Sequence, residues 1–315
     1  MKAIQYNTFG GSEVISVNQI SKPKINNDNE VLIEVKAASV NPLDIKIRMG
    51  YMQQMRPVTL PFTPGLDAAG IVVAVGKNVA NFKIGDEVVA TTMGNAYAEF
   101  LIANENFVSH KPDNITFEEA TSLAVNIGTA ETILFKEGKL EKGQTLLIQG
   151  AAGAVGATMV QLAKNKGLYV IATASGKGIE LAKNLGADQV IDYKTQDVAT
   201  LVKNVDLVAD CAGGASQTKL FQVIKAGGKL LSIAGMPSPE LAEKFKIDAR
   251  FISSDLSAKN LANGFALVKE GKLNAFVTKI FKLEEAAQAQ DFVSAGGTNG
   301  KVVLDIKKNI NENYI

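Results

Sequence analysis

The chain has 315 residues, of which 46% are apolar, and its 33 basic and 32 acidic side chains leave a formal net charge of +1. At roughly 150 residues per domain this length predicts two domains, each with enough apolar residues for a packed core. The balanced charge argues against a nucleic-acid-binding protein, which needs a basic excess. The single cysteine, Cys211, and the single histidine, His110, exclude an internal disulfide and a zinc site built from Cys and His ligands.

The amino end of the chain shows no targeting segment, because MKAIQYN does not continue into an apolar signal core. The uncharged stretch from Gln144 to Ala163 has the length of a membrane span. Glycines and glutamines interrupt it, so a strand, a turn and a helix explain it better. Together with the single cysteine, which fits a reducing compartment, these features predict a cytoplasmic protein with neither a membrane nor a nucleic-acid partner.

The first third of the chain is predicted to form short strands joined by turns. Runs rich in β-branched residues at 31–40 and 69–76 are followed by shorter runs at 85–90 and 97–103, with glycine or asparagine between them. No long helical period interrupts these runs. The pattern predicts a small, irregular β-barrel-type domain, and His110 in SHKPD is expected in a loop with a structural or solvent role.

From about Phe117 the pattern changes to helices that alternate with buried strands. Near-continuous apolar runs are typical of parallel strands covered on both faces, and five of them follow one another at 145–149, 169–174, 189–193, 206–211 and 229–234. The repeated alternation predicts an α/β fold with a doubly wound parallel sheet. Cys211, at the end of the fourth run, is expected to be a small buried hydrophobic residue.

Strand-like runs return at 276–281 and 301–306, which predicts that the chain re-enters its first domain. We therefore expect one domain from residues 1–124 and 272–315 and a second domain from residues 125–271. The polar tail, residues 307–315, is expected to fray.

A glycine-rich turn lies directly between a predicted strand and a predicted helix, in LLIQGAAGAVGATMVQLA. Glycines let a backbone turn sharply and approach a pyrophosphate, which the amides and dipole of the helix N-terminus then hold. The run AAGAVG departs from G-x-G-x-x-G only in the alanine at its first position. A purely structural turn is the alternative, but the series of strands that follows favours a dinucleotide. The predicted cofactor contacts here are Ala151, Gly153, Ala154, Val155 and Gly156.

The end of the next strand distinguishes the two nicotinamide dinucleotides. NAD-dependent enzymes carry Asp or Glu at this place, where it accepts hydrogen bonds from the ribose hydroxyls. Here Ser175 stands near the expected acidic position and Lys177 follows it. Because an ammonium attracts the 2′-phosphate that a carboxylate repels, we predict NADP(H) as the cofactor. The plain alternative is that Lys177 caps a solvated loop.

Six segments carry a family resemblance that extends in order over almost the whole chain. They are SVNPLDIKIRMG (39–50), PFTPGLDAAGIVVAVG (61–76), FKIGDEVVA (82–90), YAEF (97–100), AAGAVG (151–156) and LGADQVIDY (185–193). The sequence resembles the zinc-free quinone oxidoreductase branch of the medium-chain dehydrogenase/reductase superfamily. The resemblance implies a GroES-like domain built from both chain ends, an inserted Rossmann domain, an active site in the cleft, and a homodimer formed near residues 251–255.

The resemblance also accounts for the missing metal ligands. Where zinc-dependent relatives carry their three catalytic ligands, this sequence has Asn41, Leu66 and Val125. Without a metal to stabilise an alkoxide, reduction of a simple ketone loses its electrophile, whereas a conjugated acceptor spreads the developing charge over a phenolate or enolate that hydrogen bonds can stabilise. The expected substrate is a small quinone or α,β-unsaturated carbonyl compound.

Two other functions remain open at this point. An enoyl-thioester reductase would use the same chemistry, but the sequence has no obvious basic cluster for the phosphates of coenzyme A. A structural or regulatory protein that binds NADPH without turnover is the other alternative, because a dinucleotide fold alone does not prove catalysis.

By resemblance, Thr129 lies beside the nicotinamide, and Ser175, Lys177 and Tyr193 surround the 2′-phosphate. Tyr193 has the plain alternative of a core aromatic at a strand end. Glu131 departs from many relatives, which carry an aromatic residue there, and this departure is expected to alter the substrate pocket. Ala234, at the end of the last apolar run, completes the predicted cofactor contacts.

Three residues of the first domain are candidates for catalysis. Asn41 is predicted to contact the substrate or the nicotinamide ribose. Asp44 follows in the same N-P-x-D turn, where capping of the turn is an equal alternative. Tyr51 resembles the proton-donating tyrosine of related 2-enoyl thioester reductases, and a phenol can protonate an enolate. The alternative for Tyr51 is an exposed loop aromatic.

Overall fold

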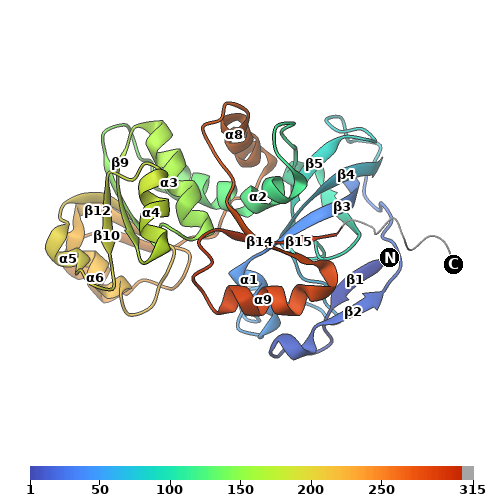
Figure 1. The fold of residues 1–315 in the computed structure, drawn as a ribbon, viewed down its shortest axis with the longest axis horizontal. Helices are drawn as coiled ribbons and strands as arrows, with labels where there is room; N and C mark the ends of the chain where they lie inside the picture. Colours follow the sequence, from blue (N-terminus) through green and yellow to red (C-terminus); the bar gives the residue numbers. More distant parts are fainter. Residues whose placement is uncertain (307–315) are drawn as a thin grey trace. The chain divides into compact units, whose positions relative to one another are not determined.

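The computed structural model describes residues 1–306, which form two compact units. Unit 1 contains Met1–Val125, Leu256–Lys269 and the chain from Ala275 onward, and unit 2 contains Asn126–Asp255 and Glu270–Asn274. The chain passes from unit 1 to unit 2 within one helix, α2 (Phe117–Glu131) (Figure 1). The tail that the sequence predicts to fray lies outside the described residues.

Unit 1 is built on a seven-stranded sheet in which the strand order is β14-β15-β3-β4-β5-β7, with β6 paired to β3. Alternate side chains of β3 and β4, such as Ile33 and Val72, are fully buried in its core. A separate two-stranded sheet pairs β1 (Lys2–Gln5) with β2 (Ser16–Gln19). The seven strands are β3 (Glu30–Val40), β4 (Asp67–Val75), β5 (Glu87–Thr91), β6 (Phe100–Asn104), β7 (Val108–His110), β14 (Val277–Lys282) and β15 (Lys301–Asp305).

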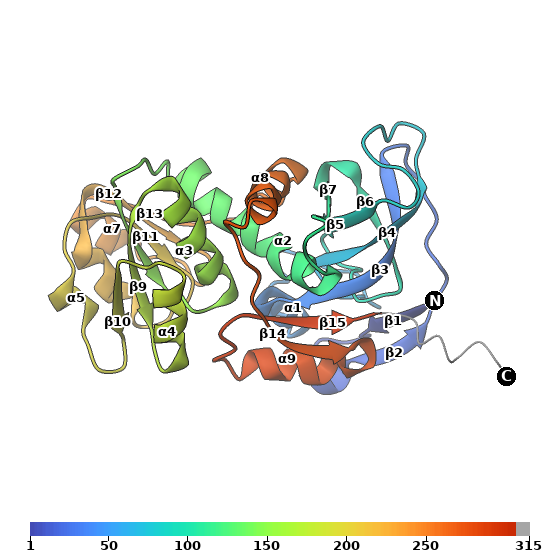
Figure 2. The ribbon, with the colours of Figure 1, turned by 45° about the horizontal axis from the view of Figure 1, so that its top comes forward.

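The C-terminal strands lie in the sheet that the N-terminal part of the chain forms. Strand β15 pairs antiparallel with β3, so that Val302 faces Val40 and Val303 faces Ser39. Figure 2 shows this red strand beside the blue β3. The register carries Lys301, the first residue of β15, to the end of β3 where Asn41 begins the next element.

Helix α1 (Pro42–Arg48) begins directly after β3, in a part of the chain where the sequence suggests only strands and turns. Asn41 is its N-cap, Pro42 occupies its first turn, and the Asp44 side chain accepts a hydrogen bond from the Asn41 backbone N–H. Its seven residues are too few to show a helical period. Helix α1 packs against α9 (Ala286–Ser294), and α8 (Ala258–Lys269) packs against β7. Short 3₁₀ turns lie at Ser12–Val14, Glu105–Phe107 and Leu283–Glu285.

The expectation of a loop at His110 is wrong, because His110 is the last residue of strand β7 and pairs with Val88 of β5. Its side chain is exposed, lies 3.2 Å from the Asn81 carbonyl oxygen through Nε2, and stacks 4.9 Å from the Phe82 ring. A three-residue strand that ends just before a lysine and a proline is too short to be recognised from its sequence.

Unit 2 is built on a six-stranded sheet in the order β10-β9-β8-β11-β12-β13, and every pair in it is parallel. This confirms the predicted doubly wound α/β fold, and the five predicted runs all form strands. The strand order reverses between β8 and β11, and ligands of such sheets bind at the carboxyl ends of the strands at this switch point. The strands are β8 (Thr145–Gln149), β9 (Tyr169–Ala174), β10 (Gln189–Asp192), β11 (Val205–Asp210), β12 (Ile224–Ser232) and β13 (Asp248–Phe251).

Helices connect the parallel strands of unit 2. Helix α3 (Ala154–Lys166) packs against β8 and β9, and α4 (Lys177–Asn184) packs against β9 and β10. Within residues 1–306, no helix combines the length and the apolarity that a bilayer span requires. The remaining helical segments are Thr132–Glu137, which continues α2, and α5 (Val198–Leu201), α6 (Gln217–Leu220), Phe221–Val223 and α7 (Pro239–Phe245).

Candidate active site

The glycine turn between β8 and α3 has the shape that the sequence predicts. Gly150 adopts φ +81°, which only glycine tolerates readily, and a Cβ on Gly156 would lie 2.3 Å from the Gly150 carbonyl oxygen. The backbone conformation and packing of the turn therefore require glycine at these two positions. Gly153 is different, because a Cβ there would meet only the Gly150 oxygen, at 3.4 Å. Its missing side chain leaves open space beside the turn, which is what the close approach of a pyrophosphate requires.

The first turn of α3 presents unpaired amides beside this space. Gly153 is the N-cap, and the N–H groups of Ala154, Val155 and Gly156 precede the first residue that can bond within the helix. The turn carries no acidic side chain, so nothing opposes an anion at the positive end of the helix. Ala151 differs from the other predicted contacts, since its N–H already donates to the Thr173 carbonyl oxygen at 3.1 Å.

The three residues predicted to surround the 2′-phosphate lie at the ends of β9 and β10. The Ser175 hydroxyl donates to the Tyr193 hydroxyl at 2.9 Å, and Lys177 is the exposed first residue of α4. Tyr193 is 58% exposed, which excludes the alternative of a core aromatic. Two hydroxyls and an ammonium open to solvent suit a phosphate monoester, which accepts hydrogen bonds and carries negative charge.

A buried acid that the sequence analysis did not single out organises the same edge of the sheet. Asp210 ends β11 and is completely buried. Its Oδ1 accepts hydrogen bonds from the Gln149 side chain and from the Ala212 and Gly213 amides, and its Oδ2 accepts from the Gln217 side chain and the Ser232 hydroxyl, at 2.7 to 3.1 Å. We call this set of residues the unit 2 polar cluster.

The unit 2 polar cluster fixes two loops at the carboxyl edge of the sheet. The Ser232 hydroxyl accepts hydrogen bonds from the amides of Gly235 and of the predicted cofactor contact Ala234. A signal for this cluster was present in the sequence. Gln149, Asp210 and Ser232 are polar residues at, or within two positions of, the ends of three predicted apolar runs, and the carboxyl ends of neighbouring parallel strands meet at one edge.

Three further residues of unit 2 occupy distinct environments. The Thr129 hydroxyl is buried and lies 2.9 Å from the Ser254 hydroxyl. Glu131 is partly buried, and this burial raises the pKa of its carboxyl above the ordinary value. Burial and the neighbouring Asp210 charge raise the pKa of the Cys211 thiol, so that its reactive thiolate is scarce at neutral pH.

Unit 1 buries a second group of polar side chains around the start of α1, which we call the unit 1 polar cluster. All of its members are at most 5% exposed, and they come from three strands or strand ends, helix α1 and the loop before β6. Its members are Ser39, Asn41, Asp44, Asp67, Tyr97 and Lys301.

Asp44 is held by three donors. Its carboxylate accepts hydrogen bonds from the Asn41 N–H at 2.9 Å, the Gly65 N–H at 3.2 Å and the Tyr97 hydroxyl at 3.0 Å. Burial, helped by the charge of Asp67, raises the pKa of Asp44 to about 6, although the donors from Asn41 and Tyr97 oppose the change. Asp44 therefore caps the helix, as its alternative reading proposed, and also titrates near neutral pH.

Asp67 shares the cluster with a buried ammonium. It accepts hydrogen bonds from the Ser39 hydroxyl at 2.6 Å and the Asn41 side-chain amide at 3.1 Å. The Lys301 ammonium donates to the Asn41 Oδ1 at 2.5 Å. Burial raises the pKa of Asp67 and lowers the pKa of Lys301, while their mutual attraction opposes both changes.

The positions that the resemblance aligns with metal ligands lie around Asp67. Asn41 donates to it through its side chain, and the Val125 N–H donates to it at 3.3 Å. Leu66, the residue before Asp67, is buried. Among residues 1–306, no three His, Cys, Asp or Glu side chains come close enough together to hold a metal ion.

Of the three predicted catalytic residues, the structure brings Asn41 and Asp44 together and leaves Tyr51 apart from them. Tyr51 lies in the turn after α1, where its N–H donates to the Lys46 carbonyl oxygen, and it is 71% exposed. This exposure agrees with the alternative interpretation of Tyr51 as an exposed loop aromatic. It also leaves the side chain accessible to a ligand from solvent.

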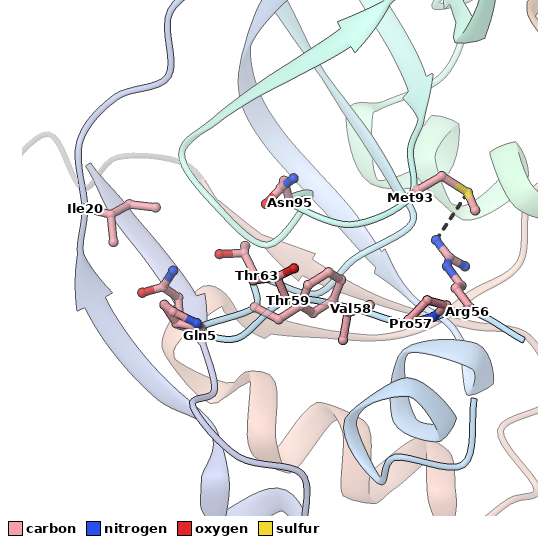
Figure 3. A pocket seen from close by; sticks show the side chains of 11 residues that line it. Gln5, Ile20, Arg56, Pro57, Val58, Thr59, Thr63, Met93 and Asn95 are labelled. Atoms are coloured by element: carbon pink, nitrogen blue, oxygen red, sulfur yellow. Dashed lines mark hydrogen bonds between the residues drawn. The ribbon is translucent and has the colours of Figure 1, made fainter. Parts of the chain in front are cut away.

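A groove of about 540 Å³ lies in the surface of unit 1. Figure 3 shows the side chains that line it. Arg56 is the charged residue in its lining, and its guanidinium lies 3.2 Å from the Met93 sulfur. Among the described residues, none of the predicted site residues lines this groove. Its lining consists of Gln5, Ile20, Arg56, Pro57, Val58, Thr59, Pro61, Phe62, Thr63, Met93 and Asn95.

Two family models match the chain in separate segments. The alcohol dehydrogenase GroES-like domain matches residues 27–138, which lie mostly in unit 1. The zinc-binding dehydrogenase model matches residues 185–304, which cover the second half of unit 2 and the C-terminal strands.

Known proteins match the chain almost from end to end. The chloroplast envelope quinone oxidoreductase homolog of Arabidopsis thaliana is 34% identical over 97% of this chain and 98% of its own length. The NADPH-dependent alkenal/one oxidoreductase of the same plant is 34% identical over 96% of this chain and 79% of its own. The solved quinone oxidoreductase of Coxiella burnetii superimposes with a TM-score of 0.90 at 32% identity, over 98% of this chain and 99% of its own. The chain belongs to the zinc-free quinone oxidoreductase branch of the medium-chain dehydrogenase/reductase superfamily.

Proposed function

We propose that this protein is an NADPH-dependent oxidoreductase that reduces quinones or α,β-unsaturated carbonyl compounds without a zinc ion. The observation that carries the proposal is the group formed by Ser175, Lys177 and Tyr193 beside the glycine turn. An enzyme that used NAD would place a carboxylate there. The relatives named as quinone oxidoreductase and NADPH-dependent alkenal/one oxidoreductase support the same activity.

The residues of unit 2 hold the cofactor at three places. Bound NADPH supplies the hydride, and the protein supplies binding and orientation. The amides at the start of α3 receive the pyrophosphate, and Lys177 with its two hydroxyl neighbours receives the 2′-phosphate. Thr129 is assigned to the nicotinamide end, and the unit 2 polar cluster holds Ala234 in its loop.

Unit 1 supplies the residues assigned to the substrate. Asn41 is proposed to contact the substrate or the nicotinamide ribose, with Asp44 fixing the turn that carries it. Tyr51 is proposed as the proton donor, because it resembles the proton-donating tyrosine of related reductases and its side chain is exposed to solvent, from which a ligand arrives. Glu131, where many relatives are aromatic, is proposed to shape the substrate pocket.

An acceptor panel tests the function directly. NADPH absorbance would be followed with 1,4-benzoquinone, 9,10-phenanthrenequinone, 2-alkenals and crotonyl-CoA, and each reaction would be repeated with NADH. We expect NADPH oxidation with the quinones or the alkenals and a clear preference for NADPH over NADH. Preferential reduction of crotonyl-CoA would establish the enoyl-thioester alternative. Tight NADPH binding without oxidation by any acceptor would instead establish a binding protein.

We also propose that the protein is a cytoplasmic homodimer with the domains assigned from its sequence, residues 1–124 with 272–315 and residues 125–271. Strand β13 (Asp248–Phe251) is at the edge of its sheet and leaves backbone groups available to a second copy. Light scattering coupled to gel filtration would give twice the 33.4 kDa chain mass for a dimer. A proline in place of Ala249 should then yield the monomer.

A further inference from the structure

Lys301 reaches the start of α1 from the opposite end of the chain. It is 260 residues from Asn41 in sequence, yet the pairing of β15 with β3 sets its ammonium against the Asn41 side chain. The side chain of Lys301 is buried, with 5% of the residue exposed. Burial of a lysine ammonium is unfavourable unless hydrogen bonds and opposite charges compensate it, so a specific role must justify its presence.

The donors and acceptors of this cluster fix the orientation of the Asn41 side-chain amide. An ammonium can only donate, so the Asn41 atom that faces Lys301 must be the oxygen. An ionised carboxylate can only accept, so the atom that faces Asp67 must be the nitrogen. Both neighbours therefore select the same amide orientation.

One of the two N–H groups of the Asn41 side-chain amide makes no short hydrogen bond. One N–H donates to Asp67 at 3.1 Å. The other contacts of this nitrogen, to the Ser39 carbonyl and hydroxyl oxygens, are 3.4 Å long, which exceeds the usual range for a hydrogen bond. The amide oxygen, by contrast, is already taken by Lys301.

Charge balance ties Lys301 to both acids of the cluster. The attraction of Asp67 and Asp44 opposes the lowering of its pKa by burial, and its own positive charge opposes the raising of theirs. Removal of the ammonium would deprive the buried carboxyls of Asp44 and Asp67 of a positive charge that favours their ionised forms. Asp67 would then be driven towards its protonated form, which can donate a hydrogen bond and no longer selects the nitrogen of Asn41.

We propose that Lys301 is a positioning residue for the reduction: with Asp67, it holds Asn41 so that this side chain offers an N–H, and never its carbonyl oxygen, to an oxygen atom of the substrate or of the nicotinamide ribose. The inference rests on the proposed function, because it deepens the role assigned to Asn41 there. It also specifies the complementary chemistry, since the group that Asn41 meets must be a hydrogen-bond acceptor.

The kinetic test compares two buried lysines of unit 1. Lys301→Met removes the ammonium from Asn41, whereas the control Lys111→Met removes one that donates to the Pro112 and Ile115 carbonyl oxygens. At saturating NADPH, we expect Lys301→Met to lower kcat about tenfold or more, because displacement of a positioning group impairs the reacting geometry. The primary isotope effect with NADPH deuterated at the transferred position should rise. Lys111→Met should leave both quantities unchanged per folded molecule.

A measurement that needs no turnover tests the geometry itself. In protein labelled with ¹⁵N-asparagine, the side-chain amide signals of Asn41 are assigned by their loss in Asn41→Asp. We expect them to shift or broaden in Lys301→Met and to stay in place in Lys111→Met. Unchanged signals in Lys301→Met would overturn the proposal, and so would an unchanged kcat and isotope effect in that variant.

The outcomes separate this inference from the proposed function. If none of the acceptors supports NADPH oxidation by the wild type, the proposed function is wrong. The amide signals still decide whether Lys301 holds Asn41. If Lys301→Met does not fold, Lys301→Met combined with Asp67→Asn removes both buried charges and tests the same amide. Lys301→Arg, which keeps the positive charge and the donor, should recover part of kcat and bring the Asn41 signals back towards their wild-type positions. No recovery in a folded Lys301→Arg protein would count against the proposal.

Discussion

Each unit buries a polar cluster near its candidate site, and the two clusters use different chemistry. In unit 2, Asp210 receives all of its hydrogen bonds from neutral amides and hydroxyls, such as those of Gln217 and Ser232. In unit 1, Asp44 and Asp67 share their surroundings with the Lys301 ammonium. The donors of the unit 2 cluster do not titrate near neutral pH, whereas the unit 1 cluster contains three groups whose ionisation depends on one another.

This difference matches the different tasks proposed for the two units. A cofactor whose phosphates keep their charge needs loops held in one position, which neutral donors around a single acid provide. The reduction proposed for unit 1 consumes a proton, and Asp44, whose pKa is raised to about 6, gives this unit a group whose protonation changes close to neutral pH. We therefore expect changes in unit 2 to alter cofactor binding and stability, and changes in unit 1 to alter pH dependence and turnover.

The largest effect is expected from Asp210→Ala. The substitution removes the acceptor that five donors share, four of them buried, and we expect the free energy of unfolding of unit 2 to fall by about 4 kcal/mol. Urea denaturation followed by a spectroscopic probe in unit 2 measures the change. NADPH affinity should fall as well, because the loop that contains Ala234 loses its support.

Asp206→Asn is the matched control at the other end of β11. Asp206 pairs with Lys225, whose side chain is 48% exposed, and accepts a hydrogen bond from the Thr145 N–H, which an asparagine oxygen still accepts. The substitution therefore mainly removes an ion pair of the kind that contributes about 1 kcal/mol or less. If Asp210→Ala proves no more destabilising than Asp206→Asn, the unit 2 polar cluster does not have the framework role assigned to it.

The next effect is a pH dependence that belongs to unit 1. Because the pKa of Asp44 is about 6 in the folded state against 3.8 for the free side chain, the folded protein binds more protons between these values. Its ionisation therefore lowers the free energy of unfolding as pH rises from about 4 through 6, by about 3 kcal/mol in total. In Asp44→Asn this contribution should be lost, which leaves the smaller decrease that comes from Asp67, whose pKa burial also raises. Denaturant unfolding of both proteins at pH 4, 5, 6 and 7 gives the difference, and parallel pH curves would show that Asp44 does not titrate in this range.

The sequence predicts the parts of the molecule that local patterns determine. The parallel sheet of unit 2 follows from its apolar runs, and the glycine turn follows from Gly150 and Gly156, which the backbone requires. Ser175 and Tyr193 meet through their hydroxyls at the ends of neighbouring strands, and Lys177 follows Ser175 by two residues, while their contact with a 2′-phosphate stays a prediction. In each of these cases the relevant residues belong to one or two neighbouring elements.

The unit 1 polar cluster could not be predicted in this way. Lys301 and Asn41 meet only because β15 pairs with β3, and no local pattern specifies that pairing across 260 residues. Helix α1 was missed because its seven residues show no period. The unit 2 polar cluster is an intermediate case, since its polar side chains lie at or near the ends of apolar runs, but only the order of the strands shows that these ends are neighbours.

A smaller effect is expected from Lys177→Ala, which tests the cofactor preference of unit 2. We expect KM for NADPH to rise about tenfold while KM for NADH is unchanged, because only NADPH carries the phosphate to which this ammonium is assigned. Lys183→Ala is the control on the same helix, where Lys183 pairs with Glu180. Equal changes for both cofactors, or equal changes in both variants, would contradict the assignment of Lys177 to the 2′-phosphate.

The smallest effect is expected from Tyr51→Phe, and it sharpens the comparison within unit 1. Tyr51 follows α1 in the sequence, and Tyr97 contacts Asp44 of α1. Tyr51 is 71% exposed, whereas Tyr97 is completely buried. For an enone substrate we expect Tyr51→Phe to lower kcat about threefold to tenfold, short of the roughly 100-fold that a fully positioned general acid contributes, because water can replace an exposed phenol.

Tyr97→Phe is the matched variant, since it also removes a single hydroxyl. This substitution removes the hydroxyl that donates a hydrogen bond to Asp44. It should therefore change the pH dependence of stability and leave the solvent isotope effect on kcat unaltered. Tyr51→Phe should do the reverse, because a proton donor acts in the reaction and contributes nothing to the buried cluster. An unchanged kcat in Tyr51→Phe would remove Tyr51 from the mechanism and leave water or the unit 1 polar cluster as the source of the proton.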